Sequence, residues 1–187
     1  MRIRNFILCG ILAVGCVGTS HAQAPGDLVQ PGVVSKIAFG SCFNPRSKES
    51  SIFAGILRHK PDVFVFLGDN IYGDTEDMEV LRKKYEELEA VEGFRKLRDS
   101  ATMIATWDDH DFGINDGGKS YPMREESERI FLDFFEDPED SPRRGRDGVY
   151  GCYSFGPLGK TCQILLLDTR FFRDELPRKK GMLGICF

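Results

Sequence analysis

The sequence predicts an α/β protein in which short apolar strands alternate with helices. Residues 63–67 form an apolar run without alternation, which is typical of a strand buried on both faces. Residues 102–106 form a second short apolar run, and a charged stretch with helical spacing separates the two. The chain has 187 residues, of which 41% are hydrophobic, so it has enough apolar material for about one domain with its own core.

The first half of this domain is expected to contain two strands and two helical stretches. The first strand covers residues 33–39, and a helix follows over residues 49–60, where apolar side chains recur at helical spacing. The buried strand at residues 63–67 comes next. Residues 77–99 then predict a long charged helix with a break near Gly93.

The second half is expected to add a strand, a helix and a closing pair of strands. The predicted segments are, in order, a strand at 102–106, a glycine-rich loop at 112–123, a helix at 124–136, a charged loop at 137–147 and strands at 149–155 and 162–167. Cys152 and Cys162 flank the turn between the last two strands. A disulfide can join them if the strands place them opposite each other, and the register that would decide this is open.

The first residues have the composition of an export signal. Arg2 and Arg4 precede an apolar run at residues 6–17, and small residues follow, ending in alanines that suit a signal peptidase. We interpret residues 1–24 as a signal peptide, because the apolar run is short for a membrane span. A membrane anchor and lipidation at Cys16 are the alternatives. In each case the domain is expected outside the cytoplasm, in the periplasm or the extracellular space.

The rest of the chain divides into a linker and one domain. Residues 25–32 contain two prolines and two glycines and are interpreted as the linker, and residues 33–187 as the domain. The formal net charge of -4 gives no electrostatic case for nucleic-acid binding. No second long apolar segment predicts a stable membrane span, and the oligomeric state is open.

Polar segments follow the ends of four predicted strands. They occupy residues 40–42, 68–72, 107–111 and 167–170. In α/β sheets the carboxyl ends of neighbouring strands meet at one edge, where ligands bind. The four segments therefore indicate an active site at this edge.

Gly68 and Asp69 directly follow the apolar strand at residues 63–67. The glycine lets the backbone turn and lets a ligand approach closely. The carboxylate can bridge two cations, and two bridged metals are a common device for hydrolysing phosphate esters. The alternative is that Asp69 only begins a turn or caps a helix.

Three carboxylates surround one histidine in the segment formed by Asp108, Asp109, His110 and Asp111. These carboxylates need metals, basic partners or solvent, because unpaired charges are costly in an apolar core. The histidine can bind a metal, donate a proton to a leaving alkoxide or stabilise an oxyanion. An exposed acidic turn is the alternative.

Taken together, the four segments resemble a known family. Gly-Ser-Cys, Gly-Asp-Asn-Ile-Tyr, Trp-Asp-Asp-His-Asp and Leu-Asp-Thr-Arg, in this order and spacing, resemble the PhoD-like alkaline phosphatases, a branch of the calcineurin-like metallophosphoesterases. The match covers residues 35–183. It implies an α/β/β/α sandwich, iron together with calcium as cofactors, and hydrolysis of small or polymeric phosphate monoesters or diesters.

The resemblance also implies roles for individual residues. Cys42 and Tyr72 match positions that bind ferric iron, and Asp69 matches the carboxylate that bridges the metal sites. Asp109 and His110 resemble a pair in which the first residue binds metal and the histidine assists the transition state or the leaving group.

Two further residues have open assignments. Asn115 competes with Asp109 as the metal ligand near this motif. Arg170 is a candidate phosphate contact, because a guanidinium pairs with phosphate bidentately, and the alternative is a surface ion pair. Cys42 has an alternative as well, as a structural cysteine or half of a disulfide.

The sequence departs from the family pattern at its C-terminal end. After residues 183–184 the family continues into a second half that supplies further metal ligands, whereas this sequence ends at Phe187. We therefore expect the N-terminal portion of the family's domain, and a catalytically inactive remnant with weak metal binding is the alternative to an active enzyme. A metal-free hydrolase with Ser41 or Cys42 as nucleophile and His110 as partner is disfavoured, because the Gly-x-Ser-x-Gly pattern is absent.

Overall fold

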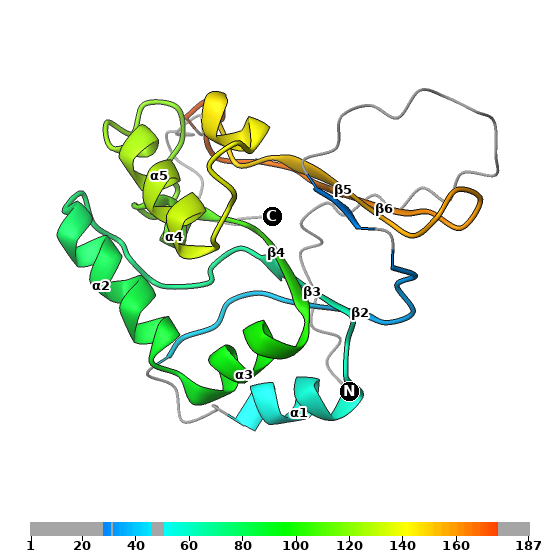
Figure 1. Ribbon diagram of the computed structural model, residues 1–187. Coiled ribbons are helices and arrows are strands. Elements are labelled where there is room, and N and C mark those ends of the chain that lie inside the picture. The colour runs from blue at the N-terminus through cyan, green and yellow to red at the C-terminus, as the bar shows by residue number, and fades with distance from the viewer. Residues whose placement is uncertain (1–27, 31, 46–50, 176–187) are drawn as a thin grey trace, which may run out of the picture.

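The computed structural model describes residues 28–30, 32–45 and 51–175 (Figure 1). The predicted signal peptide at residues 1–24 lies outside the described residues, and so does the alternative lipidation site at Cys16. In the part of the chain that is described, no helix combines the length and the apolar composition needed to cross a membrane.

The first of two sheets in the described chain is parallel throughout. It consists of β2 (Ile37–Gly40), β3 (Val63–Leu67) and β4 (Thr102–Thr106), in this spatial order. Leu67 of β3 pairs with Thr106 of β4, so these two strands end side by side. Their carboxyl ends therefore place the segments that follow them at one edge of the sheet.

The second sheet is formed by β1 (Leu28–Gln30), β5 (Gly151–Phe155) and β6 (Cys162–Leu166). β5 pairs antiparallel with β6 and parallel with β1. β1 lies inside the segment interpreted from its prolines and glycines as a linker, and its backbone pairs with β5 instead of running free.

Helices connect the strands and cover one side of the first sheet, while the β5–β6 hairpin lies on the other side (Figure 1). They are α1 (Ser51–His59), α2 (Met78–Glu89), α3 (Glu92–Ser100), the short α4 (Asp109–Phe112), α5 (Arg124–Phe134) and the 3-10 helix η1 (Pro142–Gly145). Helix, sheet and sheet thus follow one another as layers, as expected for an α/β fold with a second sheet.

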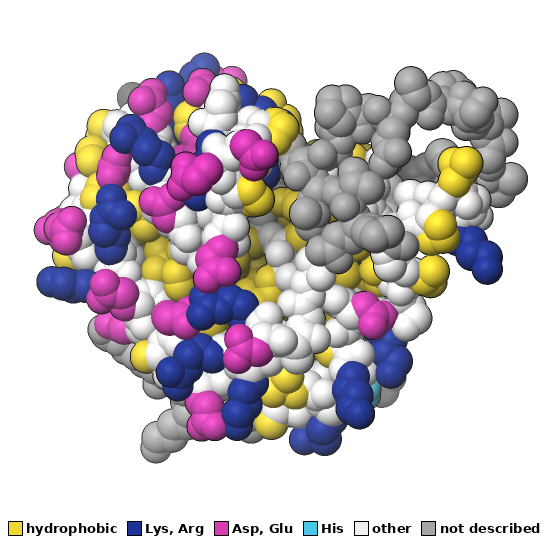
Figure 2. Space-filling model, in the orientation of Figure 1, with side chains coloured by type: hydrophobic (Ala, Val, Ile, Leu, Met, Phe, Trp, Pro, Cys, Tyr) yellow, Lys and Arg dark blue, Asp and Glu magenta, His cyan; other side chains and the backbone are white. Residues whose placement is uncertain are grey.

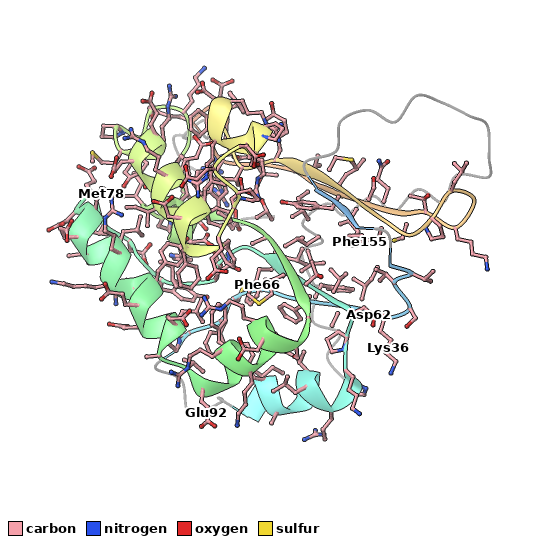
Figure 3. The ribbon with its side chains drawn as sticks, viewed as in Figure 1. Lys36, Asp62, Phe66, Met78, Glu92 and Phe155 are labelled. Atoms are coloured by element: carbon pink, nitrogen blue, oxygen red, sulfur yellow. The ribbon has the colours of Figure 1, made fainter. Side chains whose placement is uncertain are left out.

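The strand β3 is buried on both faces, as its apolar run predicts. Phe64 and Phe66 point to the helix side and join the larger core. Val63 and Val65 point the other way and pack in a second core between the two sheets, with residues such as Phe155. Phe66 and Phe155 are labelled in these two cores in Figure 3.

The helical stretch predicted at residues 77–99, with a break near Gly93, consists of two helices. α2 ends at Glu89, and α3 begins at Glu92, so the break lies just before Gly93. Gly93 lies within α3, where an added Cβ would approach the Cβ of Phe53 to 2.5 Å. The glycine therefore allows close packing of α3 against α1 and does not end a helix.

The outer surface of the helices is charged, as the sequence predicts. Arg82 of α2 pairs with Glu126 of α5 at 2.7 Å, and Lys96 pairs with Glu92 within α3. On the face shown in Figure 2, basic and acidic side chains are interspersed. Such exposed pairs add little stability, about 0–1 kcal/mol each, so the cores carry the fold.

The possible disulfide between Cys152 and Cys162 does not form. In the hairpin register Cys152 lies opposite Leu165, and Cys162 lies opposite Phe155. The two cysteines are therefore not joined to each other, and Cys162 and Cys42 are free thiols. The pairing was wrong because the loop after Phe155 closes the hairpin in a register that staggers the two cysteines by three positions.

Candidate metal centre

Three predicted site residues meet at the carboxyl edge of the first sheet. Asp69 follows β3, whereas Asp109 and His110 begin the helix that follows β4. Each of the three offers a ligand atom, and these atoms lie within 4.8 Å of one another. The group can therefore hold a metal ion. Asp62, labelled in Figure 3, marks the opposite, amino end of β3.

The turn after β3 has an unusual backbone. Gly68 has a φ of 97°, and an added Cβ there would approach the Cβ of Asp108 to 2.6 Å. Asp69 follows in the left-handed region at a φ of 50°, which non-glycine residues rarely adopt. Cys42 and Asp74 share this feature, and such backbone strain tends to gather at functional sites.

The carboxylate of Asp69 is poorly satisfied. One oxygen, Oδ2, accepts a hydrogen bond from the Cys42 sulfur at 3.5 Å, while the other, Oδ1, is buried without a hydrogen-bond partner. Burial raises the pKa of Asp69, and the charge of nearby Asp108 raises it further. A bound cation would satisfy the free oxygen and stabilise the ionised form, so this residue fits a metal ligand.

Cys42 and Tyr72 form a second group around the same aspartate. Backbone hydrogen bonds from Cys42 to Gly68 and from Phe43 to Asp69 hold the Cys42 loop against the turn after β3. Burial of the sulfur raises the pKa of the Cys42 thiol, although the residue as a whole is exposed. Burial and the neighbouring Cys42 and Asp69 raise the pKa of Tyr72 to about 12. A metal bound here would therefore have to displace protons from both groups.

Asp109 is held by two neighbours. The Asp116 amide donates to its Oδ2 at 2.8 Å, and the Arg170 guanidinium lies 3.6 Å from its Oδ1. Burial alone raises the pKa of Asp109, but the amide and the charge of Arg170 outweigh it and lower that pKa. The carboxylate is thus kept ionised beside Asp69 and His110.

Asn115 and Arg170, whose assignments the sequence left open, lie in different surroundings. Asn115 is exposed, and its side-chain amide donates to Asp116. Arg170 is largely buried, and its Nε donates to Asp108 at 2.5 Å. The guanidinium of Arg170 thus lies beside Asp69, Asp109 and His110, where its ion pair with Asp108 holds it. This ion pair is partly buried and does not lie on the surface.

His110 is oriented by a residue that the sequence did not indicate. Its Nδ1 lies 2.7 Å from Oδ1 of Asp74, and its ring centroid lies 4.4 Å from that of Tyr72. Burial lowers the pKa of His110, but the hydrogen bond to Asp74 and the charges of Asp69, Asp74 and Asp109 outweigh it and raise that pKa. The imidazole is therefore favoured as a proton donor.

Replacing Asp74 by asparagine is expected to lower the pKa of His110 in the metal-free protein, measured by NMR titration of the ring. Because the pKa of His110 is higher in the folded than in the unfolded protein, the Asp74–His110 pair stabilises the fold. The stabilisation is fully present at pH values below the unfolded pKa of about 6.5. This stabilisation is lost as the pH rises through the folded pKa, so wild type and variant should converge in stability at alkaline pH. The exposed Asp99→Asn is the control, and an unchanged His110 titration in Asp74→Asn would contradict the pairing.

The sequence indicated Asp111 as one carboxylate of an acidic segment, but it did not indicate that this residue is buried. Asp111 has 0% exposure, and it binds the turn after β3 through Asn70. Burial raises the pKa of Asp111 well above its usual value. The position of Asp111 three residues after Asp108, at the start of a helix, was the available signal, because that spacing suits a capping contact.

Comparison with known proteins identifies a solved structure with a similar fold. No protein-family model matches this chain, and no curated protein matches it. A solved structure described as "Structure of PhoD" matches with a TM-score of 0.63 and 17% sequence identity. The match covers 79% of this chain and 34% of that chain, so this chain spans about a third of the length of that protein. The chain therefore shares the α/β fold of the part of that structure that it matches.

Proposed function

We propose that this chain forms a metal-dependent phosphoesterase centre that hydrolyses phosphate monoesters or diesters. The observation that carries the proposal is the meeting of Asp69, Asp109 and His110, whose ligand atoms lie within 4.8 Å of one another. This group sits at the sheet edge where α/β proteins bind ligands, in a fold similar to that of PhoD.

The donor types support iron together with calcium as the metals. Cys42 and Tyr72 would provide the anionic sulfur and oxygen donors for iron, and Asp69 would be shared between the two metals. Asp109 would provide an oxygen ligand of the kind that calcium prefers, and we favour it over Asn115 because it lies in the group. When bound, the metals would activate water and neutralise charge on the phosphate.

The remaining residues would act on the substrate and on the ligands. His110 would lie beside the metals rather than bind them, with its Nδ1 held by Asp74 at 2.7 Å, and its Nε2 would donate a proton to the oxygen of the leaving group. Arg170 would hold Asp109 and Asp108 in place, and it would attract the phosphate by its charge. The export of the chain, with a signal at residues 1–24, is proposed from the sequence alone.

A metal-binding protein without catalysis is the second candidate. The observation that favours it is the small number of donors in the group, which are two carboxylates and one imidazole. Calcium usually takes 6–8 oxygen ligands, so this group alone would bind it weakly. Turnover separates this candidate from the first.

The decisive experiment assays the full chain on p-nitrophenyl phosphate and on bis-p-nitrophenyl phosphate, with added iron and calcium. We expect turnover that is lost after chelation and falls by about a thousand-fold or more in Asp69→Asn, because the transition state would lose its metal support. Asp99→Asn, an exposed carboxylate on α3, should leave turnover unchanged.

The outcomes separate the candidates. Turnover that survives both chelation and Asp69→Asn would overturn a metal-dependent centre. Metal binding by a folded protein without turnover would favour the second candidate.

A further inference from the structure

Asp111 is the most deeply buried acid near the metal group, and a network of amides satisfies it. Its Oδ1 accepts a hydrogen bond from the Asp108 amide at 2.7 Å. Its Oδ2 accepts from the backbone amide of Asn70 at 3.1 Å and from the Asn70 side chain at 2.5 Å. A buried carboxylate is tolerated only with such bonds, so this arrangement specifies the local structure.

The network joins the two turns that carry the metal group. Asn70 directly follows Asp69 in the turn after β3, and Asp108 directly precedes Asp109 in the turn after β4. The Asn70 side chain also donates to the carbonyl of Thr106, the last residue of β4, at 3.0 Å. One carboxylate thus sets the position of one turn relative to the other.

We propose that Asp111, through Asn70, is a positioning residue that sets the distance between Asp69 and the Asp109–His110 pair. This inference rests on the proposed metal centre. Asp111 touches no reacting atom, and its effect passes through the neighbours of the ligands. Residues that orient metal ligands in this way typically change metal affinity by about 10–100-fold when they are replaced.

The first test measures Mn²⁺ affinity by the electron paramagnetic resonance signal of the free ion. Asp111→Asn keeps the shape of the side chain but places an amide against the donors of Asn70, and we expect about 10–100-fold weaker Mn²⁺ binding. Asn70→Ala should also weaken binding. The loss of Mn²⁺ affinity in the double variant should be smaller than the product of the two single losses, because both substitutions break the same Asp111–Asn70 hydrogen bonds.

A stability control separates positioning from loss of fold. Ile164→Ala removes packing in the second core, between the sheets, where Ile164 has 5% exposure. It should lower the unfolding midpoint and leave Mn²⁺ affinity within about two-fold, because remote sites act independently. Equal losses of affinity in Ile164→Ala and Asp111→Asn would overturn the proposal. If Asp111→Asn does not fold, Asn70→Ala carries the comparison.

The second test needs no metal and follows amide hydrogen exchange. The Asn70 and Asp108 amides should be protected in the wild type and should exchange faster in Asp111→Asn, while β3 and β4 amides stay protected. Unchanged exchange at both amides would overturn the link. Absence of Mn²⁺ binding by the wild type would overturn the proposed function instead, and the exchange data would still decide the role of Asp111.

Discussion

Replacing Arg143 by methionine is expected to lower the free energy of unfolding by about 3–5 kcal/mol. Arg143 has 3% exposure and hydrogen-bonds to Asp137 at 3.2 Å and to the Tyr153 hydroxyl at 2.6 Å. Its other terminal nitrogen donates to the carbonyls of Ala105 at 3.3 Å and Val149 at 2.8 Å. The variant would leave these acceptors and a nearly buried carboxylate without their partner, which is the costly way to break a buried pair.

The effect should be large because Arg143 links separate parts of the fold. The residue belongs to η1, its acceptors lie on β4, β5 and the loops beside them, and its guanidinium lies 5.9 Å from the ring of Phe131 on α5. Urea unfolding would measure the loss. Arg129→Met is the matched control, because that side chain is 65% exposed and pairs with Glu126 on its own helix. A loss below about 1 kcal/mol in Arg143→Met would contradict the role of the network.

Replacing His110 by alanine is expected to lower the turnover number by about 10²–10⁴-fold, the usual contribution of a general acid. The loss should depend on the leaving group. An alkoxide from an alkyl phosphate needs the proton of His110, whereas p-nitrophenolate leaves readily without it. Turnover of the alkyl phosphate should therefore fall far more in the variant than turnover of the p-nitrophenyl ester.

Steady-state kinetics on the two substrates would measure this difference, together with Mn²⁺ binding to monitor the metal group. His59→Ala is the matched control, since His59 is an exposed residue at the end of α1. Equal losses on both substrates, together with much weaker Mn²⁺ binding, would assign His110 to metal binding alone.

Much of the fold could be predicted from the sequence because it depends on local patterns. The apolar runs at residues 63–67 and 102–106 coincide with β3 and β4, since a strand buried on two faces needs a continuous apolar stretch. The helix expected over residues 49–60 is α1, which begins and ends within two residues of the prediction. The second core was expected only from the family resemblance, which implies two facing sheets, because no local pattern indicates that β5 and β6 lie across from β3.

The pairing of distant segments is what the sequence left undetermined. The register of the β5–β6 hairpin decides that Cys152 and Cys162 stay apart, and it depends on how the whole hairpin packs against the first sheet. The strand β1 likewise forms only because β5 offers a partner for it. Prolines and glycines around residues 28–30 gave the opposite local signal.

For the metal group, the sequence alone determined the residues that follow strand ends. Asp69, Asp109 and His110 could be expected together, because parallel neighbouring strands end at one edge. Only the tertiary structure placed Asp74 against His110, 36 residues away, and Asp111 against Asn70, 41 residues away. The physical reason is that a hydrogen bond between two turns depends on their separation in space, which is set by the packing of β3 against β4 and not by either turn's own residues.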